Sequence, residues 1–152
     1  MSGTDLHGKR ILVVGGETAQ GRTLAIALAE RGADVAIASL TASTEADFAI
    51  NSALNELWAL DRRGVALAID ASDSAALRDA VARAERELGR MDAACAIEPS
   101  LSLAEGERPG VREPSRIALD ALRAALPERD AIEIRASASV EESLDLVRAS
   151  LR

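Results

Sequence analysis

Several residue types that proteins use for binding and chemistry are rare or missing in this chain of 152 residues. It contains one Cys, one His, one Lys and no Tyr. A single Cys excludes an internal disulfide, and one Cys with one His argues against a transition-metal site. We therefore predict no metal, and we expect Cys95, which lies in an apolar run, to be a small core residue in a reducing compartment.

Long apolar runs and aromatic residues are also scarce. No run reaches the ~20 residues that span a bilayer, and the first ten residues lack the apolar segment of a signal peptide, so we expect a cytoplasmic protein without a membrane partner. The net charge of −7 repels nucleic-acid phosphates. The only aromatic residues, Phe48 and Trp58, lie in a segment of helical periodicity, where we expect them to pack on a helix face or in the core. Nucleic-acid binding is therefore not expected.

Apolar strand-like runs alternate with segments of helical periodicity along the whole chain. The runs predicted as strands are residues 10–15, 33–39, 65–70, 92–97 and 131–136. Such alternation is typical of a parallel sheet with right-handed crossovers. We predict an α/β fold with a single Rossmann-like domain over residues 1–152. It has three layers, with about five strands in the order 3-2-1-4-5 and helices on both faces. The aperiodic segment 99–113 is predicted to be a mobile loop.

Two helix starts have the spacing of a capping box or one similar to it. Ser139 with Glu142 predicts a capping box, and Thr44 with Asp47 is similar to one. Ligands of such sheets bind beyond the carboxyl ends of the strands where the strand order reverses, here between the first and fourth strands. The loops after these strands are therefore expected to surround one crevice.

Residues 8–95 resemble the N-terminal half of the short-chain dehydrogenase/reductase family. The resemblance lies in the segments GKRILVVGGETAQGRTLAIALAERGADVAIAS and RRGVALAIDASDSAALRDAVARAERELGRMDAA. The family's pattern G-x-x-x-G-x-G falls on Gly15, Ala19 and Gly21, so the middle glycine is replaced. The family's acidic residue near the adenine matches Asp70. The resemblance implies a Rossmann fold and a nicotinamide dinucleotide, NADP or NAD, as cofactor.

Other motifs of the family are missing. Its Asn-Asn-Ala-Gly segment would fall on residues 96–99, where none of the four matches, and its strand-five Ser corresponds at best to Ser137. Its Tyr-x-x-x-Lys pair has no counterpart, because the sequence has no Tyr and Lys9 precedes the first strand. The family's catalytic helix would lie about where the sequence stops. We therefore assign no catalytic residue and expect no autonomous dehydrogenase site.

The phosphate loop and its surroundings supply the predicted cofactor-binding residues. They are Gly15, Thr18, Ala19, Gln20, Gly21, Ser39, Leu40, Asp70, Ala71 and Ala96. Glycines let the backbone approach a pyrophosphate at a helix N-terminus, so the methyl group of Ala19 should weaken binding. Glu17 adds a negative charge that opposes an anion unless its side chain points to solvent.

The end of the second strand bears on the choice between NAD and NADP. A carboxylate there would accept a hydrogen bond from an adenosine 2′-hydroxyl, but residues 39–41 are Ser, Leu and Thr. An Arg there would favour a 2′-phosphate, and the nearest in sequence is Arg22. These residues favour NADP, or no preference, over NAD.

Three classes of function remain open at this point. The first is a cofactor-binding sensor, regulator or non-catalytic subunit. The second is a ligand-free scaffold or oligomerisation module. The third is an oxidoreductase whose catalytic groups come from a partner chain or from the 99–113 loop, which contains Glu105, Glu107, Arg108 and Arg112. The apolar stripes of segments 114–126 and 140–152 predict a homodimer through these two helices.

Overall fold

Five parallel strands form the middle layer of the protein in the order β3-β2-β1-β4-β5, as predicted. The computed structural model describes residues 6–71, 73–97, 114–126, 131–134 and 139–151. The strands are β1 (Arg10–Val14), β2 (Asp34–Ala38), β3 (Gly64–Leu67), β4 (Ala93–Ile97) and β5 (Ala131–Ile134). Two predictions from the sequence lie outside the described residues: the mobile loop at 99–113 and the match of Ser137 to the family's strand-five Ser.

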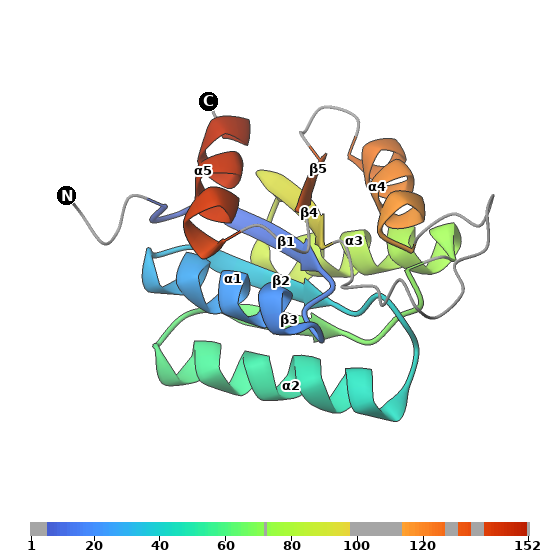
Figure 1. Cartoon of the computed structure of the whole chain (residues 1–152), viewed down its shortest axis with the longest axis horizontal. Helices are drawn as coiled ribbons and strands as arrows, with labels where there is room; N and C mark the ends of the chain where they lie inside the picture. The colour runs from blue at the N-terminus through green and yellow to red at the C-terminus, as the bar shows by residue number, and fades with distance from the viewer. Residues whose placement is uncertain (1–5, 72, 98–113, 127–130, 135–138, 152) are drawn as a thin grey trace.

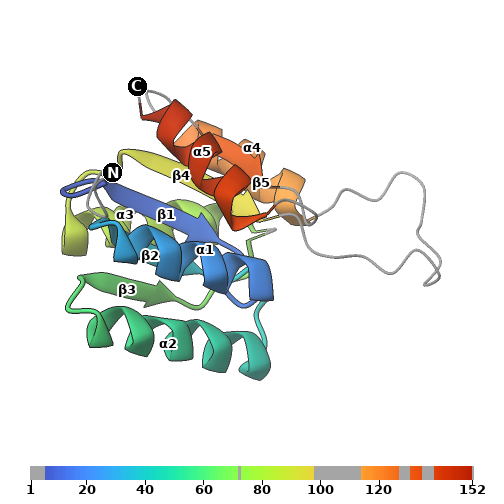
Figure 2. The same ribbon diagram turned by 60° about the vertical axis from the view of Figure 1, so that its left-hand side comes forward.

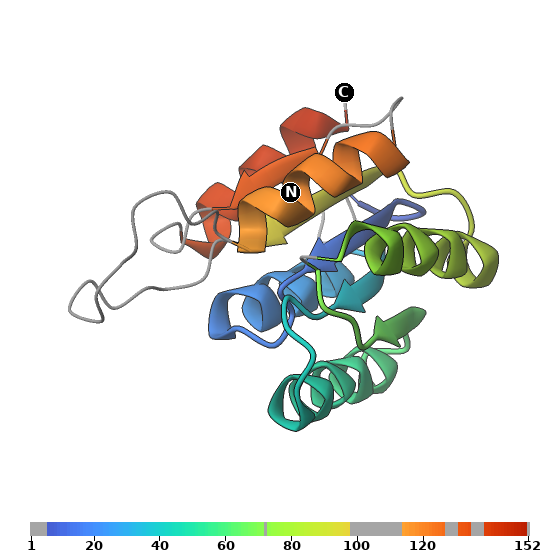
Figure 3. The same cartoon turned by 90° about the vertical axis from the view of Figure 1, so that its right-hand side faces the viewer.

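Helices cover both faces of the sheet. They are α1 (Ala19–Glu30), α2 (Thr44–Ala59), α3 (Ser74–Leu88), α4 (Pro114–Ala125) and α5 (Val140–Ser150). α1, α2 and α5 pack on one face, and α3 and α4 pack side by side on the other (Figures 1 and 3). The three predicted layers are therefore confirmed. Within the described ranges, no helix is long and apolar enough to cross a bilayer.

The central strands are apolar without interruption because both of their faces are buried. In β1, Ile11 and Val13 face the cluster under α1, whereas Leu12 and Val14 face the cluster under α3. Cys95 in β4 is fully buried, and this burial raises the pKa of its thiol to about 12. The thiol is therefore protonated at neutral pH, and the prediction that Cys95 is a core residue is confirmed.

The predicted capping box of α5 is present. The backbone N–H of Ser139 donates to Glu142 Oε1 at 3.0 Å, and the N–H of Glu142 donates to Ser139 Oγ at 3.1 Å. These hydrogen bonds lower the pKa of the Glu142 carboxyl. The predicted start of α2 is wrong by one residue. Ser43 is the N-cap, because its backbone is still extended and its hydroxyl accepts from Ala46 N–H at 3.0 Å, whereas Thr44 is already helical.

The expectation that the two aromatic residues pack against the protein is also wrong. Phe48 and Trp58 are 77% and 57% exposed. The buried stripe of α2 is formed instead by Ala46, Ile50, Ala53, Leu54 and Leu57. At about 100° per residue, Trp58 lies a quarter turn beyond Leu57, and Phe48 lies nearly opposite Ile50. Their apolar side chains therefore add to the outer surface of α2 and not to the core.

Because every strand is parallel to its neighbours, all carboxyl ends meet at one edge of the sheet (Figure 2). The strand order reverses between β1 and β4, which are direct neighbours. The loops after β1, β2 and β3 lie at this edge. In open α/β sheets this is the place where ligands bind.

Candidate functional site

The turn after β1 is built on two adjacent glycines. The N–H groups of Gly15 and Gly16 both donate to Ala38 O at the end of β2, at 2.7 and 3.1 Å. Gly15 has a φ of +106°, and a Cβ there would lie 2.8 Å from Ile97 Cβ. A Cβ on Gly16 would lie 2.0 Å from a methyl carbon of Ile37. The chain therefore needs glycine at both positions to turn so closely over β2 and β4.

Thr18 links this turn to the start of α1. Its hydroxyl donates to Gly15 O at 2.7 Å and accepts from Gly21 N–H at 2.9 Å, which makes Thr18 the N-cap. A Cβ on Gly21 would lie 2.1 Å from Gly15 O. Ala19, the first helical residue, is exposed. The N-terminus of α1, with its partial positive charge, is thus held at the sheet edge with Ala19 on its outer surface.

Glu17 points toward the end of β2. Its carboxylate oxygens accept from Leu40 N–H at 3.0 and 2.9 Å, and Oε2 also accepts from Thr41 N–H at 3.1 Å. From the sequence, we expected the charge of Glu17 to oppose a bound anion unless its side chain points to solvent. In the structure, two backbone N–H groups hold this charge at the β2 end. It therefore lies beside the phosphate loop and is partly compensated.

The ends of β2 and β3 are joined by a buried hydroxyl. Ser39 Oγ donates to Ile69 O at 2.7 Å and accepts from Ile69 N–H at 2.9 Å. Ala71 N–H then donates to Leu40 O at 2.9 Å. Leu40 and Ala71 are buried, and Asp70 is exposed beside them. Among the side chains predicted near a cofactor, Asp70 is the charged one that reaches the surface here.

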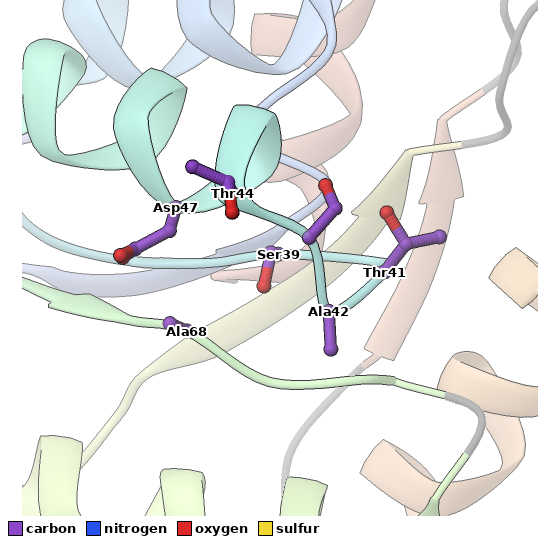
Figure 4. Close-up of a pocket in the computed structure, with 7 residues that line it drawn as sticks. Ser39, Thr41, Ala42, Thr44, Asp47 and Ala68 are labelled. Atoms are coloured by element: carbon purple, nitrogen blue, oxygen red, sulfur yellow. The ribbon is translucent and has the colours of Figure 1, made fainter.

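A hollow of about 310 Å³ lies beyond the end of β2. Its lining residues are Ser39, Thr41, Ala42, Ser43, Thr44, Asp47 and Ala68. Figure 4 shows the side chains of Ser39 and Asp47 directed toward the segment after β3 that carries Ala68. Among the described residues that line it, Asp47 is the only charged one.

Arg22 is directed away from this hollow. Its Nη1 donates to Ser52 Oγ at 3.2 Å, and Nη2 forms an ion pair with Glu56, so two side chains of α2 hold the guanidinium. Arg22 was the candidate for contact with a 2′-phosphate. This arrangement removes it from the end of β2 where such a group would lie.

Most of the predicted site residues are brought together at the carboxyl edge. Gly15, Thr18, Ala19, Gln20 and Gly21 form the β1–α1 junction, and the segments 39–40 and 70–71 lie next to it through the contacts described above. The exception is Ala96, whose side chain is buried in the cluster beneath α3 and α4. Ile97, one residue later, is the residue against Gly15.

Sequence reasoning missed the contact of Glu17 with the end of β2. The signal for it was a carboxylate in the phosphate loop together with the lack of one at residues 39–41. Within the described part of the chain, no group of three Asp, Glu, His or Cys side chains is placed so that it could hold a metal ion.

Residues 9–96, more than half of the chain, match the family described as short chain dehydrogenase. The chain belongs to this family. Its glycine-rich turn is the feature that the resemblance in sequence led us to expect, and its parallel sheet, with the strand order reversed between β1 and β4, is the arrangement that the alternation of apolar runs and helical segments predicted.

Two curated relatives match a part of the chain. An L-rhamnose 1-dehydrogenase (NAD(P)(+)) of Sphingomonas sp. strain SKA58 is 38% identical over 87 residues, which cover 57% of this chain and 33% of that protein. A cyclohexanol dehydrogenase of Rhodococcus sp. strain TK6 is 32% identical over 96 residues, covering 59% of this chain and 36% of the relative. The chain thus spans about a third of the length of these curated relatives.

Several solved structures have a similar fold. A blue fluorescent protein from a metagenomic library, in complex with NADPH, has a TM-score of 0.64 at 27% identity over 81% of this chain and 50% of that one. A short chain dehydrogenase from Mycobacterium paratuberculosis bound to NAD has a TM-score of 0.55 at 26% identity over 60% of this chain and 36% of that one. A Mycobacterium marinum dehydrogenase, at 23% identity and a TM-score of 0.65, shares the fold.

The space around Gly21 leads to a prediction about stability. Gly21→Ala should lower the free energy of unfolding by about 1–3 kcal/mol, because the new Cβ would collide with the backbone oxygen of Gly15. Ala19→Ser, at an exposed position two residues earlier, is the control and should stay within about 0.5 kcal/mol of wild type. Urea denaturation measures both, and equal stability of the two variants would contradict the tight turn described here.

Proposed function

We propose that this chain binds a nicotinamide dinucleotide, NAD or NADP, at the carboxyl edge of its sheet. The observation that carries the proposal is the junction of β1 and α1, where Thr18 caps the helix against Gly15 and Gly21. It lies next to the reversal of strand order in a chain of the short-chain dehydrogenase family. Two similar structures, one with NAD and one with NADPH, support the assignment.

The residues at this edge fit such a cofactor. The N-terminus of α1 offers backbone N–H groups and a partial positive charge to a pyrophosphate, with Thr18 and Ala19 at its start. Glu17 does not oppose the phosphates directly, since Leu40 and Thr41 hold its carboxylate at the end of β2. Asp70 is exposed where the family has an acidic residue near the adenine.

We further propose that the chain acts as a non-catalytic subunit, sensor or regulator. When bound, the nicotinamide supplies hydride-transfer chemistry, and the family uses a Tyr acid and a Lys to protonate the carbonyl. The 152 residues contain no Tyr, and their single Lys9 lies just before β1, at the opposite edge of the sheet. The chain's own residues are therefore assigned to binding and not to proton transfer.

Calorimetric titration with NAD and NADP tests the binding proposal. Ala19→Gly should tighten binding by about threefold to tenfold, because the methyl group at the outer surface of the helix start is removed. Asp70→Ala should weaken binding by about tenfold, since a hydrogen bond to a charged group is lost. Asp79→Ala, an exposed change on α3, is the control for Asp70. If neither cofactor binds to folded wild type or to Ala19→Gly at millimolar concentration, the proposal is wrong.

The non-catalytic role has a separate test. The purified chain should not oxidise alcohols or reduce carbonyl compounds with NAD(P), because the proton-transfer pair of the family has no counterpart in it. Absorbance of the reduced nicotinamide measures turnover. Activity that persists through repurification of a single molecular species would overturn this part of the proposal.

We also propose a homodimer that forms through α4 and α5. The observation that supports it is that Leu146 of α5 is 44% exposed although Leu144 and Val147 are buried, so this helix is apolar on more than its inner side. Light scattering should give twice the chain mass of 15.9 kDa at micromolar concentration. Leu146→Glu should shift the mass to that of a monomer, and a monomeric wild type would contradict the proposal.

A further inference from the structure

The end of β2 carries a fixed negative charge that comes from a different loop. Glu17, in the turn after β1, directs both carboxylate oxygens to Leu40 N–H, and Oε2 also accepts from Thr41 N–H at 3.1 Å and from Thr41 Oγ1 at 3.4 Å. Glu17 is only partly exposed. Several hydrogen bonds thus hold its charge at one place, in contrast to the free motion of a surface carboxylate.

This place corresponds to a known recognition point of the fold. In dinucleotide-binding Rossmann domains, an Asp or Glu about 20 residues after the glycine turn accepts from the ribose 2′-hydroxyl, whereas an Arg nearby accommodates a 2′-phosphate. In this chain the corresponding residues are Ser39, Leu40 and Thr41, and none of them is a carboxylate. Ser39 Oγ is engaged with Ile69, Leu40 is buried, and Thr41 Oγ1 donates to Glu17 itself.

The charges around the hollow beyond β2 have the same sign. Asp47 lines it, and Glu45 is a second exposed carboxylate in the same first turn of α2. No Lys or Arg lines the hollow among the residues that the structure describes. Arg22 is held by Ser52 and Glu56. Among the described residues, a phosphate at the end of β2 would therefore face carboxylates, with no Lys or Arg in the lining of the hollow to compensate it.

We propose that Glu17 determines the choice of cofactor in this chain, accepting from a ribose 2′-hydroxyl and repelling a 2′-phosphate. The chain then selects NAD over NADP. This inference rests on the proposed binding of a nicotinamide dinucleotide. It reverses the preference that the sequence alone suggested, because the carboxylate missing from the end of β2 is supplied by the neighbouring turn.

The experiment is calorimetric titration of the full chain with NAD and with NADP. Wild type should bind NAD at least about tenfold more tightly than NADP, since a carboxylate near a doubly charged phosphate opposes it at short range. Glu17→Gln keeps the length of the side chain and one acceptor oxygen but removes the charge. It should reduce the ratio of the two dissociation constants by about tenfold, mainly through tighter binding of NADP.

Glu30→Gln is the matched control, because it removes the same charge at the exposed opposite end of α1. It should leave the ratio unchanged. Circular dichroism checks that each variant is folded. A wild type that binds NADP as tightly as NAD, or a ratio that Glu17→Gln leaves unchanged, would overturn the inference while the proposed function stands.

Salt dependence of wild type gives a second measure that needs no variant. Because salt screens repulsion between partly exposed charges, the preference for NAD should shrink as ionic strength rises. A preference that grows with salt would indicate a cation at the 2′ position and would contradict the role of Glu17. Failure of folded wild type to bind either cofactor would contradict the proposed function, and this inference with it.

Discussion

The hydrogen bonds around the carboxyl end of β2 hold the loops of three strands in one arrangement. Ala38 O accepts from both glycines of the turn after β1, and Leu40 N–H donates to Glu17 from the same turn. On the other side, Ser39 Oγ binds both backbone groups of Ile69 after β3. A buried hydroxyl that both donates and accepts is costly to remove, because it would leave two backbone groups unpaired. These contacts bring the turn after β1 and the segments after β2 and β3 next to one another.

Much of the fold follows from local patterns in the sequence. Continuous apolar runs such as residues 10–15 identify strands buried on both faces, and glycines such as Gly32 and Gly89, both at positive φ, mark where helices end. The capping box at Ser139 could also be predicted from the sequence, because its two partners are only three residues apart. These features are local, and the handedness of crossovers then leaves few ways to order the strands.

The candidate site was predictable only in part, because its decisive contacts join residues far apart in the sequence. Glu17 and Leu40 are separated by 23 residues, and Ser39 and Ile69 by 30. The residue types alone do not predict that the Glu17 carboxylate turns toward β2. They also do not predict that the Ser39 hydroxyl is hydrogen-bonded to the backbone of Ile69. Helical periodicity also misassigned Trp58, because a residue next to a buried Leu57 can lie just outside the apolar stripe.

The central claim is that a nicotinamide dinucleotide binds at the edge where the loops after β1, β2 and β3 meet. The most direct measurement is the change of backbone amide resonances on adding NAD to the isotope-labelled chain. The largest shifts should fall on residues 15–21, 39–41 and 70–71, which surround the carboxyl end of β2. Shifts confined to other parts of the sheet, or no shifts at saturating NAD in a folded sample, would contradict the account.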